Sequence, residues 1–318
     1  MSTLEIALVG AGVMGRHHAR IIVGSTRARL AMLIDPAPAA EALAREFGVP
    51  WFPRPEAAAS AHAAIIASPT DSHEQIGLEL LDAGLPLLVE KPLAETLSSA
   101  TRLVERSRQV DVALMCGFVE RYNPAVNAAR SRLTEPPRHL VTVRHSPPAE
   151  RISTDVVFDL LIHDLDIAVM LHDHEVTRVV SSCWAPASGA VNEIADASLT
   201  FGDVGVATVS ASRASQRKSR RMLVSTSEEH IDVDLVRNTV TVYRHIRHEL
   251  SDQQTYRAQT VIDIPFVRHS GEPLQLQFEH FLDLAEGRAD ADAERASLLP
   301  AHVLADQILT DQPGGQAP

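Results

Sequence analysis

The chain has 318 residues, of which 45% are hydrophobic and 22% charged, a composition typical of a globular protein with two domains. Its formal net charge of −12 disfavours nucleic acid and anionic membranes as partners. Two cysteines are too few for a disulfide scaffold. Neither an apolar run long enough to span a membrane nor a leader before Leu4 is evident. We therefore expect a cytoplasmic protein.

The first predicted unit is a short strand, Leu4–Val9, followed by a glycine-rich turn and a helix to about Val23. The glycines in such a turn allow a tight bend, close approach of a pyrophosphate to the backbone, and close packing of helix on strand. The amides at the helix N-terminus attract phosphate. The pattern predicts a dinucleotide cofactor held by Gly10, Gly12, Val13, Met14 and Gly15.

A second strand, Arg29–Ile34, ends at Asp35, which follows Gly15 by 20 residues. In a dinucleotide-binding fold, a carboxylate at this place accepts hydrogen bonds from the adenosine ribose hydroxyls. The same carboxylate repels a 2′-phosphate. We therefore predict NAD as the cofactor and regard NADP as disfavoured.

The strand–helix alternation continues with the strand Ala63–Ser68 and a helix over His73–Ala83. One of the polar residues from Thr70 to Ser72 can cap this helix. Because strand carboxyl ends face the cofactor in this fold, the same turn can also contact it. The cofactor contacts predicted here are Ser68, Pro69, Thr70 and His73.

The strand Pro86–Val89 ends in Glu90-Lys91-Pro92, before a helix over 94–108 and a strand over 112–117. At the end of a central strand, Lys91 can stabilise negative charge that develops on a substrate oxygen. A solvated strand-end lysine fits the pattern equally well. Glu90 and Lys91 join the predicted cofactor-binding residues, and residues 1–120 predict a Rossmann domain with a doubly wound parallel sheet.

The segment Val156–Ile167 is predicted to be a helix with an unusual polar face. Asp159 and His163 are four residues apart and Asp166 follows three later, so all three share one side. A carboxylate one turn before a histidine can orient the imidazole and stabilise its protonated form, which suits a general base. An Asp–His pair on the surface is the alternative interpretation.

Four features together resemble the Gfo/Idh/MocA family of sugar and cyclitol oxidoreductases. They are the glycine turn, Glu90-Lys91-Pro92, the stretch 117–124, and Asp159-Leu-Leu-Ile-His163. The resemblance implies NAD(P) in the first domain, a sugar or polyol substrate, and an α/β second domain with a large open sheet. It also implies catalysis by Lys91, Asp159 and His163, with either Lys91 or His163 as the proton acceptor.

Two stretches, Glu120–Pro124 and Asp155–Ile167, resemble the UDP-N-acetylglucosamine 3-dehydrogenase subgroup of that family. This implies hydride transfer at C3 of a nucleotide-activated hexosamine. An inositol or free-sugar dehydrogenase and a non-catalytic NAD sensor are the alternatives.

Residues 121–318 are predicted to be a substrate-binding and oligomerisation domain with helices near 272–286 and 297–309. Consecutive strands without helices between them predict a mostly antiparallel sheet with one face covered by helices. The family resemblance implies that a second subunit covers the other face, giving a homodimer or homotetramer. The predicted strands are 139–145, 176–184, 194–201, 204–212, 221–225, 231–235 and 239–244.

Further candidates for the substrate pocket are Glu120, Tyr122, Asn123 and Arg151. Tyr122 and Asn123 can equally cap the helix that follows, and the other two can form surface salt bridges. The basic residues from Arg213 to Arg221 are interpreted as a solvated turn, or alternatively as a counter-charge for a substrate diphosphate or a neighbouring subunit. No metal site is predicted, because the paired histidines 17–18 and those at 245 and 248 lack a zinc ligand set and are interpreted as surface histidines.

Overall fold

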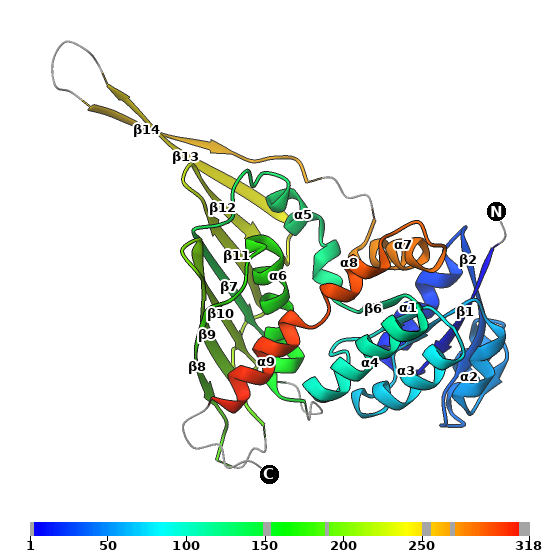
Figure 1. Cartoon of the computed structure of the whole chain (residues 1–318). Helices are drawn as coiled ribbons and strands as arrows, with labels where there is room; N and C mark the ends of the chain where they lie inside the picture. The colour runs from blue at the N-terminus through cyan, green and yellow to red at the C-terminus, as the bar shows by residue number, and fades with distance from the viewer. Residues whose placement is uncertain (1–2, 149–153, 188–190, 250–255, 268–270, 312–318) are drawn as a thin grey trace. The chain divides into compact units, whose positions relative to one another are not determined.

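The structure is a computed structural model and describes residues 3–148, 154–187, 191–249, 256–267 and 271–311. The chain folds into two compact units, shown in Figure 1. The first combines Met1–Val119 with Gly271–Val303, and the second combines Glu120–Ser270 with Leu304–Pro318. The predicted division assigned all of 121–318 to one domain, whereas residues 271–303 cluster with the first unit.

The first unit contains a parallel sheet with the strand order β3-β2-β1-β4-β5-β6. Strands β4 and β5 are apolar and buried throughout, and β1 is buried from Ile6 onward, as an all-parallel sheet covered on both faces requires. The predicted doubly wound Rossmann sheet is therefore confirmed. Its strands are β1 (Leu4–Val9), β2 (Ala28–Ile34), β3 (Trp51–Phe52), β4 (Ala63–Ile66), β5 (Leu87–Val89) and β6 (Leu114–Cys116).

The helices and short 3₁₀ turns of this unit connect successive parallel strands. They are α1 (Val13–Val23), α2 (Ala40–Glu46), η1 (Pro55–Ser60), η2 (Thr70–Ser72), α3 (His73–Asp82) and α4 (Leu97–Val110). The strand order reverses between β1 and β4, and ligands bind at the carboxyl ends of strands at such a reversal. The predicted side-chain cap of α3 is wrong, because the Ser72 hydroxyl donates to the carbonyl of Pro69 rather than accepting from the helix.

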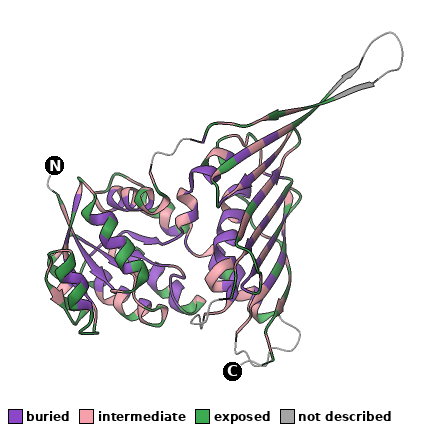
Figure 2. Cartoon of the chain, turned by 180° about the vertical axis from the view of Figure 1, so that it is seen from behind, coloured by how far each residue is buried: buried purple, intermediate pink, exposed green. Residues whose placement is uncertain are grey.

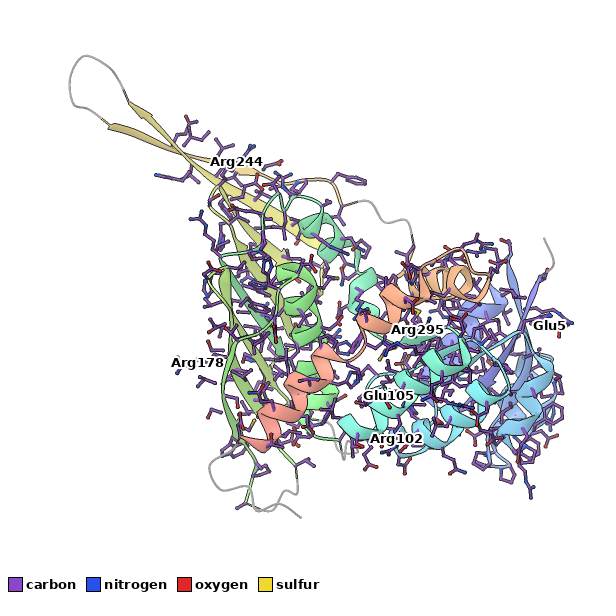
Figure 3. All side chains as sticks on the ribbon, viewed as in Figure 1. Glu5, Arg102, Glu105, Arg178, Arg244 and Arg295 are labelled. Carbon is purple, nitrogen blue, oxygen red and sulfur yellow. The ribbon has the colours of Figure 1, made fainter. Side chains whose placement is uncertain are left out.

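Two helices from late in the chain, α7 (Pro273–Ala285) and α8 (Ala291–Ala296), belong to this first unit. The Arg27 guanidinium donates to carboxylates on and just after α7, those of Glu279, Asp283 and Glu286. Arg295, labelled in Figure 3, lies on α8 and donates to the carbonyl of Val112 before β6. Helix α7 also buries Phe278, Phe281 and Leu282, so apolar packing and these polar contacts together hold residues 271–303 on the first unit.

The second unit contains a sheet with the order β14-β13-β12-β11-β7-β10-β9-β8. Every neighbouring pair is antiparallel except β7 and β10, which confirms the predicted architecture. The strands are β7 (His139–His145), β8 (Arg178–Trp184), β9 (Ile194–Phe201), β10 (Gly205–Ser212), β11 (Ser219–Ser225), β12 (Glu229–Asp234), β13 (Thr239–Glu249) and β14 (Tyr256–Asp263). The sequence analysis missed β14 and ended β13 at Arg244, because polar residues interrupt the apolar alternation there.

Helices cover one face of this sheet, and the alternation of buried and more exposed strand residues is visible in Figure 2. The covering elements include α5 (Pro124–Arg130), the π turn η4 (Val157–Leu161), α6 (Ile162–His172) and the last helix, α9 (Pro300–Thr310). The 3₁₀ turn η3 (Val119–Tyr122) precedes α5. On β7, Leu140, Thr142 and Arg144 face these helices and are buried. No helix in the described ranges has the length and apolar character that a bilayer crossing requires.

Candidate active site

The glycine turn after β1 combines tight packing with an open ligand face. Gly10 has a φ of 100°, and a Cβ there would lie 2.5 Å from the backbone of Ala67. A Cβ on Gly15 would lie 2.0 Å from the Gly10 carbonyl oxygen. A Cβ on Gly12 would meet nothing within 4 Å, and the neighbouring Val13 is 77% exposed. The first and last glycines are therefore required by packing, while the space beside Gly12 is open to a phosphate.

Asp35 lies in a groove of about 410 Å³ next to this turn. Its carboxylate accepts hydrogen bonds from the amides of Ala11 and Ala37, both at 2.8 Å. Arg16 and Glu46 also line the groove, and the guanidinium of Arg16 donates to both Glu46 oxygens at 2.7 and 2.9 Å. An open helix N-terminus beside a carboxylate is the donor and acceptor set that a dinucleotide requires.

The turn after β4 is tied to the turn after β5 by His73. Its ring nitrogens lie 2.9 Å from the carbonyl oxygen of Ser68 and 3.0 Å from that of Pro92. Burial lowers the pKa of His73 despite these carbonyl contacts. The imidazole is fully buried, so it braces the two turns, whereas Ser68, Pro69 and Thr70 retain exposed surface.

Lys91 follows β5 and is half-buried, directly after the buried Glu90. The Glu90 carboxylate lies 2.7 Å from Nε2 of His18 and accepts a hydrogen bond from the Lys91 amide at 3.2 Å. Burial acts to raise the pKa of Glu90, but the hydrogen bond and charge of His18 and the charge of Lys91 bring it below its ordinary value. The interpretation of His18 as a surface histidine is wrong: it is 1% exposed.

Asp159 and His163 lie at the start of the helical segment that the sequence predicts. Asp159 is half-buried within the π turn η4, and His163 is 9% exposed in the first turn of α6. The Asp155 carboxylate anchors the beginning of this segment by accepting hydrogen bonds from the Val157 amide and from Asn192. The predicted α-helix thus begins as a π turn, a feature frequent at functional sites.

Three arginines hold the acidic residues of η4 and α6. Arg144 donates to both oxygens of Asp164, at 2.6 and 3.3 Å, and Arg121 to both oxygens of Asp166, at 2.8 and 2.5 Å. Arg213 lies 3.4 Å from Asp159 and is 2% exposed. Its interpretation as part of a solvated turn is therefore wrong, because its guanidinium also holds Glu193 and two backbone carbonyls.

Glu120 and Asn123, two of the predicted substrate-pocket residues, are buried and engaged in structure. Glu120 accepts hydrogen bonds from Arg144 at 2.8 Å and from Asn123 at 3.0 Å. Burial opposes the charge of Glu120, but Arg144 lowers its pKa overall. Asn123 caps α5 through the Ala125 amide, so the capping alternative is confirmed for this residue. Tyr122 is half-buried in η3, and Arg151 lies outside the described residues.

The sequence analysis missed His18 and Arg144, two buried residues that contact Glu90 and Asp164. A signal for Arg144 exists in the strand alternation, which places it on the same face as Leu140 and Thr142 and thus toward the helices. A buried arginine requires carboxylate partners, and Asp164 lies directly after the candidate base. In the part of the chain that the structure describes, no three His, Cys, Asp or Glu side chains gather as a metal site.

Comparison with known proteins decides the family. Residues 4–118 match the model of an oxidoreductase family with an NAD-binding Rossmann fold, and residues 126–232 match the Gfo/Idh/MocA C-terminal domain. The chain belongs to the Gfo/Idh/MocA family. It is therefore an oxidoreductase with a nicotinamide-dinucleotide-binding domain, as the resemblance of its motifs implied.

Members of the Gfo/Idh/MocA family similar to this chain act on different substrates. The UDP-N-acetylglucosamine 3-dehydrogenase of Acidithiobacillus ferrooxidans is 28% identical over 89% of both chains. Its solved structure has a TM-score of 0.82 and covers 97% of this chain and 99% of its own at 26% identity. The inositol 2-dehydrogenase of Rhizobium meliloti is also 28% identical, over 96% of this chain and 95% of its own.

Proposed function

We propose that this family member transfers a hydride between NAD and a secondary hydroxyl of a sugar, with C3 of a UDP-N-acetylhexosamine as the first candidate. The observation that carries the proposal is the similarity, in sequence and in fold, to the UDP-N-acetylglucosamine 3-dehydrogenase over nearly the whole of both chains. The two motifs that carry the chemistry, Glu90-Lys91-Pro92 and Asp159–His163, are present in this chain.

The catalytic roles follow from the chemistry of three side chains. His163 accepts the proton of the substrate hydroxyl, and Asp159 orients the imidazole and stabilises its charged form. Lys91 stabilises the negative charge that develops on the same oxygen. When bound, the nicotinamide supplies the acceptor for the hydrogen on the carbinol carbon. Lys91 as the base, with His163 as the electrostatic partner, is the alternative assignment.

NAD rather than NADP is proposed because of the charges around the adenosine end of the groove. The carboxylate of Asp35 is placed to accept from ribose hydroxyls and to repel a 2′-phosphate. Arg16, the cation that lines the same groove, is already held by both oxygens of Glu46. A 2′-phosphate would therefore meet an anion and a neutralised arginine.

A second candidate substrate is an inositol or a free sugar. The inositol 2-dehydrogenase has the same identity as the nucleotide-sugar enzyme and covers slightly more of the chain. We propose measuring NADH formation with UDP-N-acetylglucosamine, UDP-N-acetylgalactosamine, myo-inositol and glucose. Turnover with a UDP-sugar alone supports the first candidate, and turnover with myo-inositol alone supports the second. NAD binding without turnover of any sugar would instead support the non-catalytic sensor.

A substitution tests the role of the histidine once a substrate is known. His163→Ala is expected to lower kcat by about 100-fold or more, the usual contribution of a general base, with an unchanged Kd for NAD measured by calorimetry. His174→Ala, at an exposed histidine just after the same helix, is the matched control and should retain wild-type turnover. Wild-type turnover in the His163 variant would remove that residue from the chemistry.

We also propose a cytoplasmic homo-oligomer, a dimer or a tetramer, assembled through the second sheet. The face of the sheet opposite α5 and α6 carries apolar side chains, of which Val180 is 52%, Trp184 53% and Val206 40% exposed. The strand register places all three on this same face. The family resemblance implies that a second subunit covers this face, and exposed apolar side chains on it are compatible with such an interface.

A further inference from the structure

One end of the second sheet gathers three arginines beside η4 and α6. Strand β11 begins next to the ends of β7 and β10. Arg144 on β7 is the register partner of Arg220 on β11, and Arg213 directly follows β10. Arg220 shares its side of β11 with the buried Met222, whereas Arg221 is on the opposite side and is exposed. Arg220 therefore faces the helices, as Arg144 does.

Two of these arginines use their donors to hold the fold together. The guanidinium of Arg144 donates to both oxygens of Asp164 and to Oε1 of Glu120. That of Arg213 donates to two carboxylates and to two backbone carbonyls. These bonds fix η4 and α6, the segment that carries the candidate base.

Arg220 is held by a single, longer contact. Among the residues that the structure describes, its guanidinium makes one ion pair, with Nη1 3.6 Å from Oε1 of Glu120, and no hydrogen bond. That distance exceeds a hydrogen bond, and the same oxygen already accepts from Arg144 at 2.8 Å. A guanidinium has five N–H donors. Because the Arg220 side chain is 35% exposed, these donors can reach a ligand.

The charges around Arg220 connect it with the candidate base. Burial is the largest influence and lowers the pKa of Arg220, and the charge of Arg144 acts in the same direction. The carboxylates of Glu120, Asp164 and Asp159 oppose this, but the pKa stays below its ordinary value. Asp159, which the proposed function assigns to catalysis, is therefore near enough to act on this guanidinium. A bound anion would offset the burial of the cation.

We propose that Arg220 binds the diphosphate of the substrate and thereby selects a nucleotide sugar over a neutral polyol. The inference rests on the proposed function, in which His163 takes the proton of a sugar hydroxyl. In a nucleotide sugar the diphosphate is attached at the anomeric carbon, across the ring from the C3 hydroxyl, so it needs a cation near the catalytic pair rather than in it. The planar fork of an arginine can donate two parallel hydrogen bonds to phosphate oxygens. An inositol offers no anion to this fork.

The test measures the binding of UDP without any turnover. The NADH-loaded wild type and Arg220→Gln are titrated with UDP by calorimetry. The Kd for UDP is expected to rise by about 10- to 100-fold in the variant, the usual effect of losing hydrogen bonds to a charged group. Uridine has the same base and ribose but no phosphate, so its affinity should not change. Arg220→Lys keeps the charge without the fork and should weaken UDP by only a few-fold.

The control variant is Arg237→Gln, which removes one positive charge from an exposed turn of the same unit and should bind UDP as the wild type does. Circular dichroism reports whether each variant folds. If Arg220→Gln does not fold, Arg220→Lys decides, and wild-type affinity for UDP in that variant overturns the inference.

Three other results overturn the inference. The first is a wild type that binds no UDP, or an Arg220→Gln variant that binds it equally well. The second is an equal loss of affinity for UDP and uridine, which shows that Arg220 only balances the charge of Glu120 and supports the fold. The third is weaker binding of glucuronate with unchanged binding of UDP, which assigns Arg220 to a sugar carboxylate.

Activity provides a second readout where a UDP-sugar is a substrate. Arg220→Gln should raise KM for the UDP-sugar by a similar factor and leave kcat within a few-fold of the wild type, because the bond to the diphosphate is made equally in the ground state and the transition state. An unchanged KM overturns the inference and leaves the proposed function intact. Absence of wild-type turnover on every sugar counts against the proposed function, whereas the UDP titrations still decide the role of Arg220.

Discussion

At the scale of single residues, Asp35 holds two backbone amides in the fold and, in the proposed function, also binds the cofactor. Its two oxygens accept from the amides of Ala11 and Ala37 and so hold the loops on either side of the groove. In the proposed function, the same charge faces the ribose hydroxyl at which NAD and NADP differ. A substitution that keeps the hydrogen-bonding shape but removes the charge separates these two functions.

We predict that Asp35→Asn reduces the preference for NAD over NADP by about tenfold, the effect of removing one nearby charge of the same sign as the 2′-phosphate. Glu46→Gln, which releases Arg16 from its ion pair, should strengthen NADP binding by a few-fold, in line with an exposed pair. Fluorescence titrations with both reduced cofactors give the ratio of Kd values. An unchanged ratio in both variants would mean that these charges do not select the cofactor.

Glu90 makes a prediction about stability and pH. Burial acts to raise its pKa, yet His18 and Lys91 bring that pKa below the ordinary value. When folding lowers the pKa of a carboxyl group, its ionised form stabilises the folded protein at pH values above the pKa in the unfolded chain, about 4.3 for glutamate. This stabilisation is lost as the pH falls through the lower pKa of the folded protein. Glu90→Gln should therefore be destabilised by about 1–3 kcal/mol at pH 7.

Below about pH 4.3, the unfolded pKa of a glutamate, this difference should shrink, because only the wild type gains a proton there. Melting temperatures of both proteins between pH 7 and pH 3.5 measure the effect. If the difference in melting temperature between the two proteins instead grows as the pH falls, folding raises the pKa of Glu90 rather than lowering it.

The candidate residues that could be predicted from the sequence are those whose place in the fold follows from the residues close to them along the chain. The glycine turn, Asp35 and Lys91 are defined by their distance from a strand end, and the parallel sheet fixes which strand ends are neighbours. His18 was not predictable, since its partner Glu90 lies 72 residues away and no periodicity links them. A histidine beside an exposed histidine on one helix gives no sign of which is buried.

At the scale of elements, the segment η4–α6 is held by carboxylate–arginine pairs to the parts of the chain around it. Arg144 is fully buried between Asp164 and Glu120. Burial acts to lower the pKa of the arginine, but the two carboxylates outweigh burial and raise that pKa above its ordinary value. This network fixes the helix that carries His163. The sequence predicts the helix but not its π turn, because a single inserted residue in the hydrogen-bond ladder leaves the apolar pattern unchanged.

Arg144→Met is predicted to destabilise the protein by about 3–5 kcal/mol, because it leaves the buried Asp164 without its ion-pair partner and Glu120 with only Arg220, at 3.6 Å. Arg237→Met removes an exposed pair with Asp234 and should cost less than about 1 kcal/mol. Urea unfolding followed by tryptophan fluorescence compares the two. If both substitutions lower the free energy of unfolding by the same small amount, the buried network stabilises the protein no more than the exposed pair does.

At the scale of the whole molecule, the sequence predicts the type of each of the two sheets but not the return of residues 271–303 to the first unit. The sheets follow from periodicity and turns, which are local. The return depends on pairs such as Arg27 with Glu279, separated by 252 residues. An amphipathic helix such as α7 does not reveal in its own sequence which of the two units it packs with.

The proposed assembly makes a prediction at this scale. Trp184→Glu and Val206→Glu place charges on the open face of the second sheet and should convert the oligomer into monomers, measured by light scattering after size-exclusion chromatography. Val236→Glu is the control, because Val236 is 49% exposed in a turn rather than on this face. A wild-type protein that is already monomeric, or variants with unchanged mass, would show that this face is not the interface.

The most direct test of the central claim is a crystal structure of the wild-type protein with NADH and its sugar substrate bound together. We expect the amine of Lys91 and the imidazole of His163 both to lie within hydrogen-bond distance, about 2.6–3.2 Å, of one hydroxyl oxygen beside the nicotinamide. A complex in which either side chain lies on the order of 10 Å from that oxygen, far beyond hydrogen-bond reach, would contradict the proposed chemistry.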